Sequence, residues 1–295
     1  MVALIQMVID VCKHYGSTLT IACITIVAVQ TCMLLWWGVY FVSLMSSVDS
    51  KYTVVVMLGM TFSLSWITQF FHAFISYVVG GCVLWYFVKS DTDLLNPVNR
   101  VILHCRCALS TSFGTVCKGA LLCPFSQMIL FLNHWSKYRL NMNSNKLSFR
   151  GVVGMLVLPF VEFSNRHNKL AFCLTATYGR TLCKAADDHI AAYPQTLELS
   201  LEDLTGHTLK AVAIGIAGTV AILFGLFVEK KDSSWPLFVF TAFYLSYCGL
   251  SLVAQTYHSA IDALIVSFAS QPVKLAMENQ IVYLRFLRNT ETELR

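Results

Sequence analysis

Two ionisable side chains stand at helical spacing inside the last long apolar stretch of the chain. His258 and Asp262 are four residues apart, so both lie on one face if this stretch is a helix. A carboxylate in such a segment is costly to bury and is a functional candidate by default. Asp262 could neutralise a bound cation, relay a proton with His258, or form a structural ion pair with Lys210 or Lys118, and His258 can instead be a packing residue.

No arrangement typical of an enzyme accompanies this pair. The sequence contains no GxSxG, HExxH, P-loop or GxGxxG motif, so we predict no catalytic residues, no enzymatic activity and no cofactor. Of the 11 cysteines, the closest pair, Cys105 and Cys107, has no matching second pair, and most of the others lie in apolar runs. We therefore predict no metal site and interpret the cysteines as small packing residues.

The composition describes the surroundings of these residues. Of the 295 residues, 56% are hydrophobic and 13% are charged, about half the charged share of a soluble domain. This excludes most soluble enzymes, disordered proteins and nucleic-acid-binding modules, so we predict no nucleic-acid partner. The formal charge of +5 comes from basic residues in loops between long apolar runs, which is typical of membrane topology. The sequence therefore predicts an integral membrane protein whose partner is the lipid bilayer.

The apolar runs predict an all-α, polytopic transmembrane helical bundle of about six to seven spans, forming one domain over 1–295. The run 1–12 is interpreted as a partial first span, since a full crossing needs about 20 residues. The remaining clear spans are predicted at 17–45, 53–88, 107–133, 206–228 and 235–268.

Glycines and other small residues suggest where these spans bend or touch. The run 53–88 is longer than a bilayer requires, so we expect it to tilt, bend at Gly80-Gly81 or extend beyond the membrane. In the span 206–228, small side chains predict close contact with a neighbouring helix. The residues predicted for that contact are Ala211, Gly215, Gly218 and Gly225.

The flanking charges predict an orientation but leave one region open. The segment 271–295 contains four basic residues and is predicted to be a cytoplasmic amphipathic tail, which places the connector 229–232 outside. The region 134–205 is interpreted as a basic loop and amphipathic helices, with one uncertain span within 151–192. Charge alone disfavours a crossing there, because the basic segment 134–150 would then be external.

Several short segments match family signatures in a fixed order. They are WITQ at 66–69, WYF at 85–87, ALSTSFGTVCKG at 108–119, NKLAFCLTATYG at 168–179, GRTLCKAADD at 179–188 and AIDAL at 260–264. The longest resembles N-R-x-A-Y-x-x-I-A-I-Y-G, and the next resembles G-K-S-F-C-x-S-A-[RK]-D. Together the segments resemble the choline transporter-like proteins, solute carrier family 44, most closely the fungal and plant branch.

The resemblance implies a function and a topology. It implies a multi-pass protein of the plasma membrane that moves choline or a related amine by alternating access. It also implies that residues 49–52 are external and that 151–192 crosses once, against the charge-based preference. Asp187 stands where the family has Arg or Lys, and members have about ten spans. The alternative is therefore a truncated, non-transporting scaffold or accessory subunit, and the sequence leaves its oligomeric state open.

Choline is a quaternary ammonium without a donor on nitrogen, so a site for it requires aromatic faces and a nearby carboxylate. Each aromatic candidate can instead pack against lipid or against other helices. The predicted binding residues are Trp66, Gln69, Phe70, Tyr244, Tyr247, Tyr257 and Asp262. Asp188, through Arg180 or Lys184, and His258 are predicted to act in gating or proton relay, and Asn168 and Tyr178 are positions that the motif alone suggests.

Overall fold

The computed structural model of the chain contains only helices and turns in the part that it describes, which confirms the all-α fold. In the described part, six main helices follow one another along the chain: α1 (Val2–Ser47), α2 (Thr53–Val88), α3 (Pro97–Leu109), α6 (Lys169–Tyr178), α8 (Gln195–Phe227) and α9 (Trp235–Ser270). The structure describes residues 2–47, 52–88, 96–121, 169–181, 184–185, 195–227, 235–270 and scattered positions within 273–284. The predicted loop 134–205 and the tail 271–295 therefore lie mostly outside the described residues.

Four helices are long and apolar enough to cross a bilayer. They are Gln6–Leu44, Val55–Val88, Thr208–Leu226 and Val239–Phe268, which match four of the predicted spans. Helix is the expected form, because lipid offers the backbone no hydrogen-bond partners. The start of α9 contains a residue that suits a helix N-terminus. Pro236 lies in the first turn, where its missing N–H costs nothing.

The first helix joins two stretches that the sequence separated. The backbone of α1 leaves helical geometry only at Gly16, with φ 62° and ψ −149°, values that favour glycine. The predicted partial span and the predicted span 17–45 are therefore two parts of one kinked element. Tyr15 fixes the first part to α2, because its hydroxyl donates a hydrogen bond of 2.6 Å to the carbonyl of Cys82.

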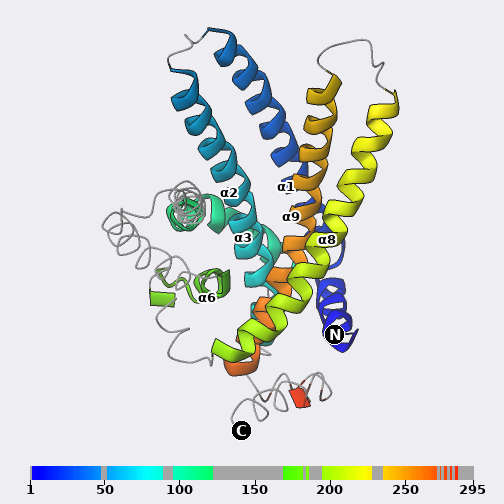
Figure 1. The fold of residues 1–295 in the computed structure, drawn as a ribbon. Helices are drawn as coiled ribbons and strands as arrows, with labels where there is room; N and C mark the ends of the chain where they lie inside the picture. Colours follow the sequence, from blue (N-terminus) through cyan, green and yellow to red (C-terminus); the bar gives the residue numbers. More distant parts are fainter. Residues whose placement is uncertain are drawn as a thin grey trace, which may run out of the picture.

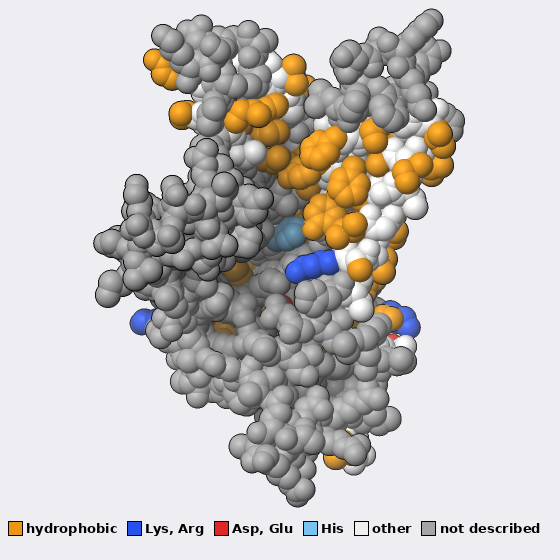
Figure 2. Space-filling model, in the orientation of Figure 1, with side chains coloured by type: hydrophobic (Ala, Val, Ile, Leu, Met, Phe, Trp, Pro, Cys, Tyr) orange, Lys and Arg blue, Asp and Glu red, His pale blue; other side chains and the backbone are white. Residues whose placement is uncertain are grey.

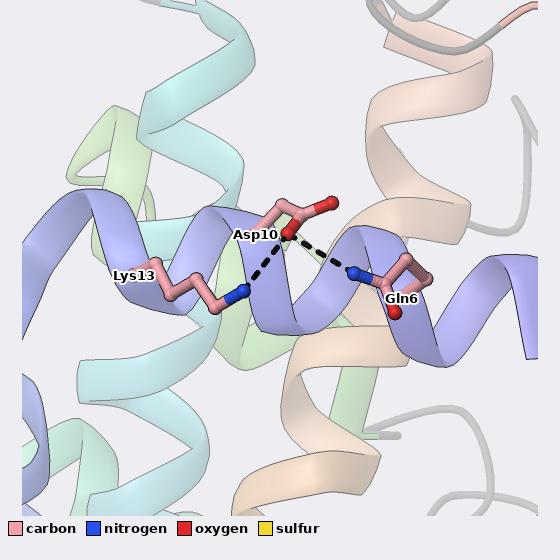
Figure 3. A network of polar contacts seen from close by, with 3 residues as sticks. All are labelled: Gln6, Asp10 and Lys13. Carbon is pink, nitrogen blue, oxygen red and sulfur yellow. Dashed lines mark hydrogen bonds and ion pairs between the residues drawn. The ribbon is translucent and has the colours of Figure 1, made fainter.

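The kink turns the N-terminal part of α1 across α2 and α9 (Figure 3). The outer face of this part is polar: Asp10 accepts a hydrogen bond of 3.3 Å from Gln6 and pairs with Lys13 at 3.6 Å. Its inner face is apolar and buried, with Met7, Val8 and Val11 in the core. This part of α1 therefore covers the other helices instead of forming a separate crossing.

The long helices form two hairpins, α1 with α2 and α8 with α9 (Figure 1). The end of α1 and the start of α2 lie at the same end of the bundle as the end of α8 and the start of α9. The described residues on either side of positions 48–51 and 228–234 therefore lie at one end of the bundle. Whether 151–192 crosses the membrane stays a prediction, because most of that region lies outside the described residues.

The upper parts of both hairpins expose apolar side chains (Figure 2). On α1, Trp36 is 77% exposed and Val39 is 73% exposed, and on α8, Leu226 is 73% exposed. Patches of this size on a soluble protein would drive association, but lipid covers them without cost. The exposed apolar surface is therefore the lipid-facing side of the bundle.

The face by which α8 packs on α9 differs from the predicted one. Ala211 and Gly215 are exposed, and a side chain at Gly218 would have open space around it. The buried positions are Ala213, Ala217, Ala221 and Gly225. The prediction was wrong for all but Gly225, because both faces of this helix contain small residues at four-residue spacing and only the position of α9 selects one.

Gly80 and Gly81 do not hinge α2, which stays helical from Thr53 to Val88. Their role is close packing: a Cβ at Gly80 would collide with Cys173 Sγ of α6, and one at Gly81 would lie 2.7 Å from the Cβ of Ala176. The missing side chains let α6 approach α2 at both positions.

The predicted span 107–133 is also interrupted. Helix α3 ends at Leu109, residues 110–112 form a turn, and a new helical stretch occupies 113–121. The sequence missed this turn because no glycine or proline marks it. Residues 122–133 of the predicted span lie outside the described part.

Candidate functional site

A buried row of polar side chains lies between α2 and α9, and we call it the polar seam. Its members are His72 and Ser76 of α2 and Ser251, Gln255 and Ser259 of α9. Gln255 donates to Ser76 Oγ at 2.9 Å, and Ser259 donates to the same oxygen at 3.0 Å. One turn away, His72 Nε2 lies 3.3 Å from Ser251 Oγ. The seam therefore joins the two hairpins by hydrogen bonds inside an apolar bundle.

Asp262 and His258 continue the seam along α9. They are 5% and 6% exposed, so both predicted residues are buried among helices and do not face lipid. Asp262 interacts electrostatically with Cys173 of α6, whose Sγ packs on Gly80 of α2. The carboxylate therefore lies where α2, α6 and α9 meet. A charge at membrane depth is costly when it faces lipid, and here the side chain faces protein.

Lys210 and Lys118 were predicted as alternative ion-pair partners of Asp262, and both are exposed. Lys210 is exposed on α8 and makes no ion pair with Asp262 within the described residues. Lys118 is also exposed, on the helical stretch 113–121. A structural pair with Lys210 is thus not the explanation for the buried carboxylate.

The predicted aromatic residues are spread along α2 and α9. Trp66 is 39% exposed and Tyr257 is 44% exposed. Phe70 is half-buried and contacts Phe71, Phe74 and Phe113 edge-to-face or tilted, at centroid distances of 5.5 to 6.2 Å. These contacts connect α2 to the helical stretch that begins at residue 113.

Tyr244 and Tyr247 interact with residues of α9 and, for Tyr244, also of the neighbouring α2. Tyr244 is hydrogen-bonded to Thr68 of α2 and to Cys248, and Tyr247 stacks on Phe243 at 6.3 Å. Gln69 is half-buried on α2. Among the described residues, no two of the five predicted aromatics contact each other by their rings. The bundle thus brings Asp262 and His258 together and leaves the aromatic cage a prediction.

The predicted gate lies partly outside the described residues, which include neither Asp188 nor Asn168. Tyr178 ends α6 and is 42% exposed, and the guanidinium of Arg180 lies 5.6 Å from its ring centroid. The chain turns at Gly179, whose φ of 64° favours glycine, so the motif glycine has a clear structural role as a helix terminator.

Sequence reasoning missed several buried polar residues. Gln30 of α1 is fully buried, and within the described part neither of its amide atoms has a hydrogen-bond partner. Ser76, Gln255 and Ser259 were missed as well. The signal for α9 was present, since residues 255, 258, 259 and 262 repeat at three and four positions and define one polar face.

A cavity of about 470 Å³ lies apart from the seam, between α2, α3 and the end of α6. Two aromatic residues, Tyr77 and Trp85, line it from α2, and the guanidinium of Arg100 lies 4.2 Å from the Trp85 centroid. Arg180 lines the opposite side, and no Asp or Glu is among the described lining residues. The described lining is therefore basic.

His104 of α3 also lines this cavity and is 5% exposed. Burial, and next the positive charge of Arg100, lower the pKa of His104 to about 4. The imidazole is therefore neutral at pH 7. Among the described residues, no three His, Cys, Asp or Glu side chains gather in a way that could hold a metal ion.

The chain resembles known proteins over nearly its whole length. Residues 1–273 match the family model described as plasma-membrane choline transporter. A CTL-like protein of Dictyostelium discoideum is 21% identical over 291 residues, which cover 95% of this chain and 50% of that protein. Protein PNS1 of Debaryomyces hansenii is 22% identical over 72% of this chain and 43% of its own length. Protein PNS1 of Candida albicans is 25% identical over 69% and 36%, respectively.

The matched family is one of membrane proteins, in agreement with the long apolar helices of the structure. The chain spans half or less of the length of these relatives. The family match covers all four long helices and both sites described above, including the motif segments around Trp66, Tyr178 and Asp262. The chain belongs to the plasma-membrane choline transporter family.

Proposed function

We propose that the protein moves choline or a related organic amine across the plasma membrane. The support is the family match over residues 1–273 together with a buried carboxylate, Asp262, at the junction of three helices. In this proposal Asp262 balances the positive charge of the amine while it is out of water. Opposite charges about 4 Å apart are worth about 4 kcal/mol at an effective dielectric of about 20, enough to favour a cation over a neutral solute.

In this proposal, α2 and α9 move against each other at the polar seam. Small hydroxyl and amide side chains, such as Ser76, Gln255 and Ser259, can exchange hydrogen-bond partners when α2 and α9 shift against each other. Each such bond is worth only about 0.6 kcal/mol in a membrane protein, so breaking a few costs little. We propose alternating access in which the α1–α2 and α8–α9 hairpins rock about the seam around a site near Asp262.

The aromatic residues enter the proposal through their nearness to this path. Phe70 lies on α2 before the first seam residue of that helix, and Tyr244 lies on α9 before the first seam residue there. In another conformation each can turn a ring face toward a cation. Trp66, Tyr247 and Tyr257 are further candidates on the same two helices. A quaternary ammonium would gain up to about 2 kcal/mol from each face that it contacts in a desolvated site.

The test is uptake of labelled choline by vesicles that contain the purified 295-residue chain. We expect uptake above that of empty vesicles, reduced by an excess of unlabelled choline. A panel of ethanolamine, dimethylethanolamine and choline as competitors then ranks amines by methylation, which distinguishes an aromatic site from one that relies on hydrogen bonds.

The contrary result is equally clear. If folded protein, verified by circular dichroism and by a single thermal transition, gives no uptake above empty vesicles for any of these amines, the 295-residue chain does not transport them by itself. The result would favour a scaffold or accessory role.

A further inference from the structure

The N-terminal part of α1, residues 2–15, lies across other helices of the bundle and is joined to the rest of α1 at Gly16 (Figure 3). We call this part the strap. We propose that the strap is a gate, which closes the bundle beside Asp262 and opens by rotation about Gly16. The gate has a ligand to admit only if the proposed function holds, because that function places the amine at Asp262.

The half of the bundle that contains Asp262 is closed on all sides. Every position of α2 from 73 to 84 and of α9 from 258 to 267 is buried, whereas none from 61 to 70 of α2 is. Successive side chains of a helix point in different directions around its axis, so an unbroken run of buried positions requires neighbours all round. A ligand therefore reaches Asp262 only if one of the covering elements moves.

The strap is one of these covering elements. Helix α1 contacts α2, α3 and α9. The buried apolar side chains of the strap belong to the same hydrophobic core as the buried runs of α2 and α9, and they are Met7, Val8 and Val11. The strap is therefore packed on the closed half of the bundle and is part of what closes it.

The contact of the strap with α2 lies at the level of the buried carboxylate. The hydroxyl of Tyr15, the last residue of the strap, donates a hydrogen bond of 2.6 Å to the carbonyl of Cys82. Cys82 lies two residues after Gly80, on which Cys173 packs, and Cys173 interacts electrostatically with Asp262. Release of Tyr15 would therefore uncover α2 beside the proposed site.

Gly16 has the properties of a hinge. Its φ of 62° and ψ of −149° lie in a region that essentially only glycine adopts. A Cβ at this position would meet nothing within 4 Å, so no packed neighbour restrains the residue. Hinges are single positions that absorb a large change of backbone angles, and glycine does so with the least steric cost. The strap can therefore swing while residues 17–47 stay in place.

The strap is attached to the bundle by few contacts. Among its described side chains, that of Tyr15 makes the only hydrogen bond to another helix. The ring of His14 adds an edge contact with Tyr86 of α2, at a centroid distance of 5.0 Å. The polar side chains of the outer face bond to one another along the strap, and they are Gln6, Asp10 and Lys13 (Figure 3). Such a segment can open locally while the other helices stay packed.

Two native cysteines report on the position of the strap. Cys82 is fully buried, and its thiol interacts electrostatically with Cys12 of the strap. Cys173 is equally buried, but it packs between α6 and α2. The test measures how fast N-ethylmaleimide modifies each thiol in the purified 295-residue chain, by mass spectrometry of the two peptides. Opening of the strap exposes Cys82 and leaves Cys173 protected.

Tyr15→Phe removes the hydrogen bond and keeps the ring. We expect modification of Cys82 to accelerate about fivefold, which is the shift in an opening equilibrium that the loss of one hydrogen bond of typical net strength produces. The rate for Cys173 should not change. Tyr40→Phe is the matched control, because Tyr40 is an exposed tyrosine of the same helix, and it should behave as the wild type does.

Gly16→Ala tests the hinge independently. Alanine disfavours the backbone angles that the closed strap requires, so this variant should also accelerate modification of Cys82. Gly38→Ala is the matched control on the same helix, since its Cβ would meet nothing within 4 Å. The gate is rejected if Tyr15→Phe leaves the Cys82 rate unchanged. It is also rejected if Cys82 and Cys173 become reactive together, because that result means that the whole bundle has loosened.

Choline separates the gate from the proposed function. In vesicles that take up choline, saturating choline should accelerate modification of Cys82 in the wild type by about twofold or more, because turnover populates the open strap. Uptake without any effect of choline on Cys82 would reject the gate and retain the transport function. Absence of uptake, together with the acceleration in Tyr15→Phe, would reject choline transport and retain the strap as an element that opens.

Discussion

The polar seam and the α2–α3–α6 cavity adjoin the same half of α2 but differ in charge and in filling. The seam is closed by hydrogen bonds between small side chains and leads to the acidic Asp262. The cavity is hollow and contains two arginines. Adjacent glycines separate the regions, since Gly80 receives Cys173 beside Asp262, whereas Gly81 receives His104 of the cavity. One helix therefore presents opposite electrostatic environments on two faces.

The difference teaches how a membrane bundle of low charge content keeps two chemistries apart. Only 13% of the residues are charged, and Asp262 and the two arginines of the cavity belong to different helix contacts. The comparison predicts that a substitution on one face changes the properties of that face and leaves the other face unaffected.

The largest expected effect is on the acidic side. Asp262→Asn should lower choline uptake by on the order of a hundredfold or more, because the amine loses about 4 kcal/mol of charge balance at an effective dielectric of about 20. Asp262→Glu should retain part of the uptake, because it keeps the charge. Initial rates in vesicles measure both, with Arg106→Gln as the control. Wild-type rates in both Asp262 variants would remove this carboxylate from the mechanism.

The second prediction concerns His104 and pH. The pKa of His104 is lowered from 6.5 to about 4 in the folded state, so between these values the unfolded chain binds more protons than the folded one. The contribution of His104 is therefore fully present above pH 6.5 and is lost as the pH falls toward 4, by about 3 kcal/mol at about 1.4 kcal/mol per pH unit.

This dependence is measured as the difference in thermal stability between wild type and His104→Gln from pH 7.5 to pH 4. The wild type should lose more stability on acidification than the variant does, which corrects for all other titrating groups. Parallel pH curves for the two proteins would show that His104 is not buried in its neutral form.

The third prediction addresses the boundary between the two regions. Gly80→Ala should destabilise the protein by about 1–3 kcal/mol, because its Cβ would overlap Cys173 Sγ and push α6 away from α2. Gly59→Ala is the matched control on the same helix: nothing lies within 4 Å of its Cβ position, and alanine gains about 1 kcal/mol of helix propensity there.

Cys173→Ala in the Gly80→Ala background removes the colliding sulfur and should restore part of the lost stability. Unfolding of the detergent-solubilised protein, followed by circular dichroism, measures the series. If Gly80→Ala and Gly59→Ala have the same melting temperature, α6 does not pack on α2 at this glycine.

The smallest expected effect is within the seam. Ser76→Ala removes the oxygen that accepts from Gln255 and Ser259, and should cost about 1 kcal/mol, since each of the two bonds is worth about 0.6 kcal/mol on average in membrane proteins. Thr256→Val is the control, since the Thr256 hydroxyl donates only to the carbonyl of Val253 on its own helix. A loss above 3 kcal/mol would mean that the seam is a rigid joint and not the moving interface proposed here.

Much of the fold could be predicted from the sequence. Three of the predicted spans agree with the membrane-spanning parts of the long helices to within a few residues, and the fourth, 17–45, agrees at its end but begins 11 residues after Gln6. The agreement arises because about 20 consecutive apolar residues have only one stable form in lipid. The family was also identified from short motifs around Trp66, Tyr178 and Asp262. The sequence placed Asp262 inside an apolar run, and the structure shows that its side chain is buried.

The errors share one cause. The packing face of α8, the role of Gly80-Gly81 and the turn at 110–112 all depend on which helix lies opposite, and periodicity within one segment does not contain that information. The kink at Gly16 belongs to the same class, because a glycine in an apolar run is compatible with a straight helix unless tertiary contacts select otherwise.

The sequence alone determined that lipid surrounds this protein, that its elements are helices and that a carboxylate lies within the last of the long apolar runs. Local composition was enough, because the hydrophobic effect and backbone hydrogen bonding act on each segment separately. The tertiary structure decided that residues from 77 to 181 meet in one positively charged cavity and that Asp262 lies beside Cys173. Those contacts join positions far apart in the chain, and only the packing of whole helices brings them together.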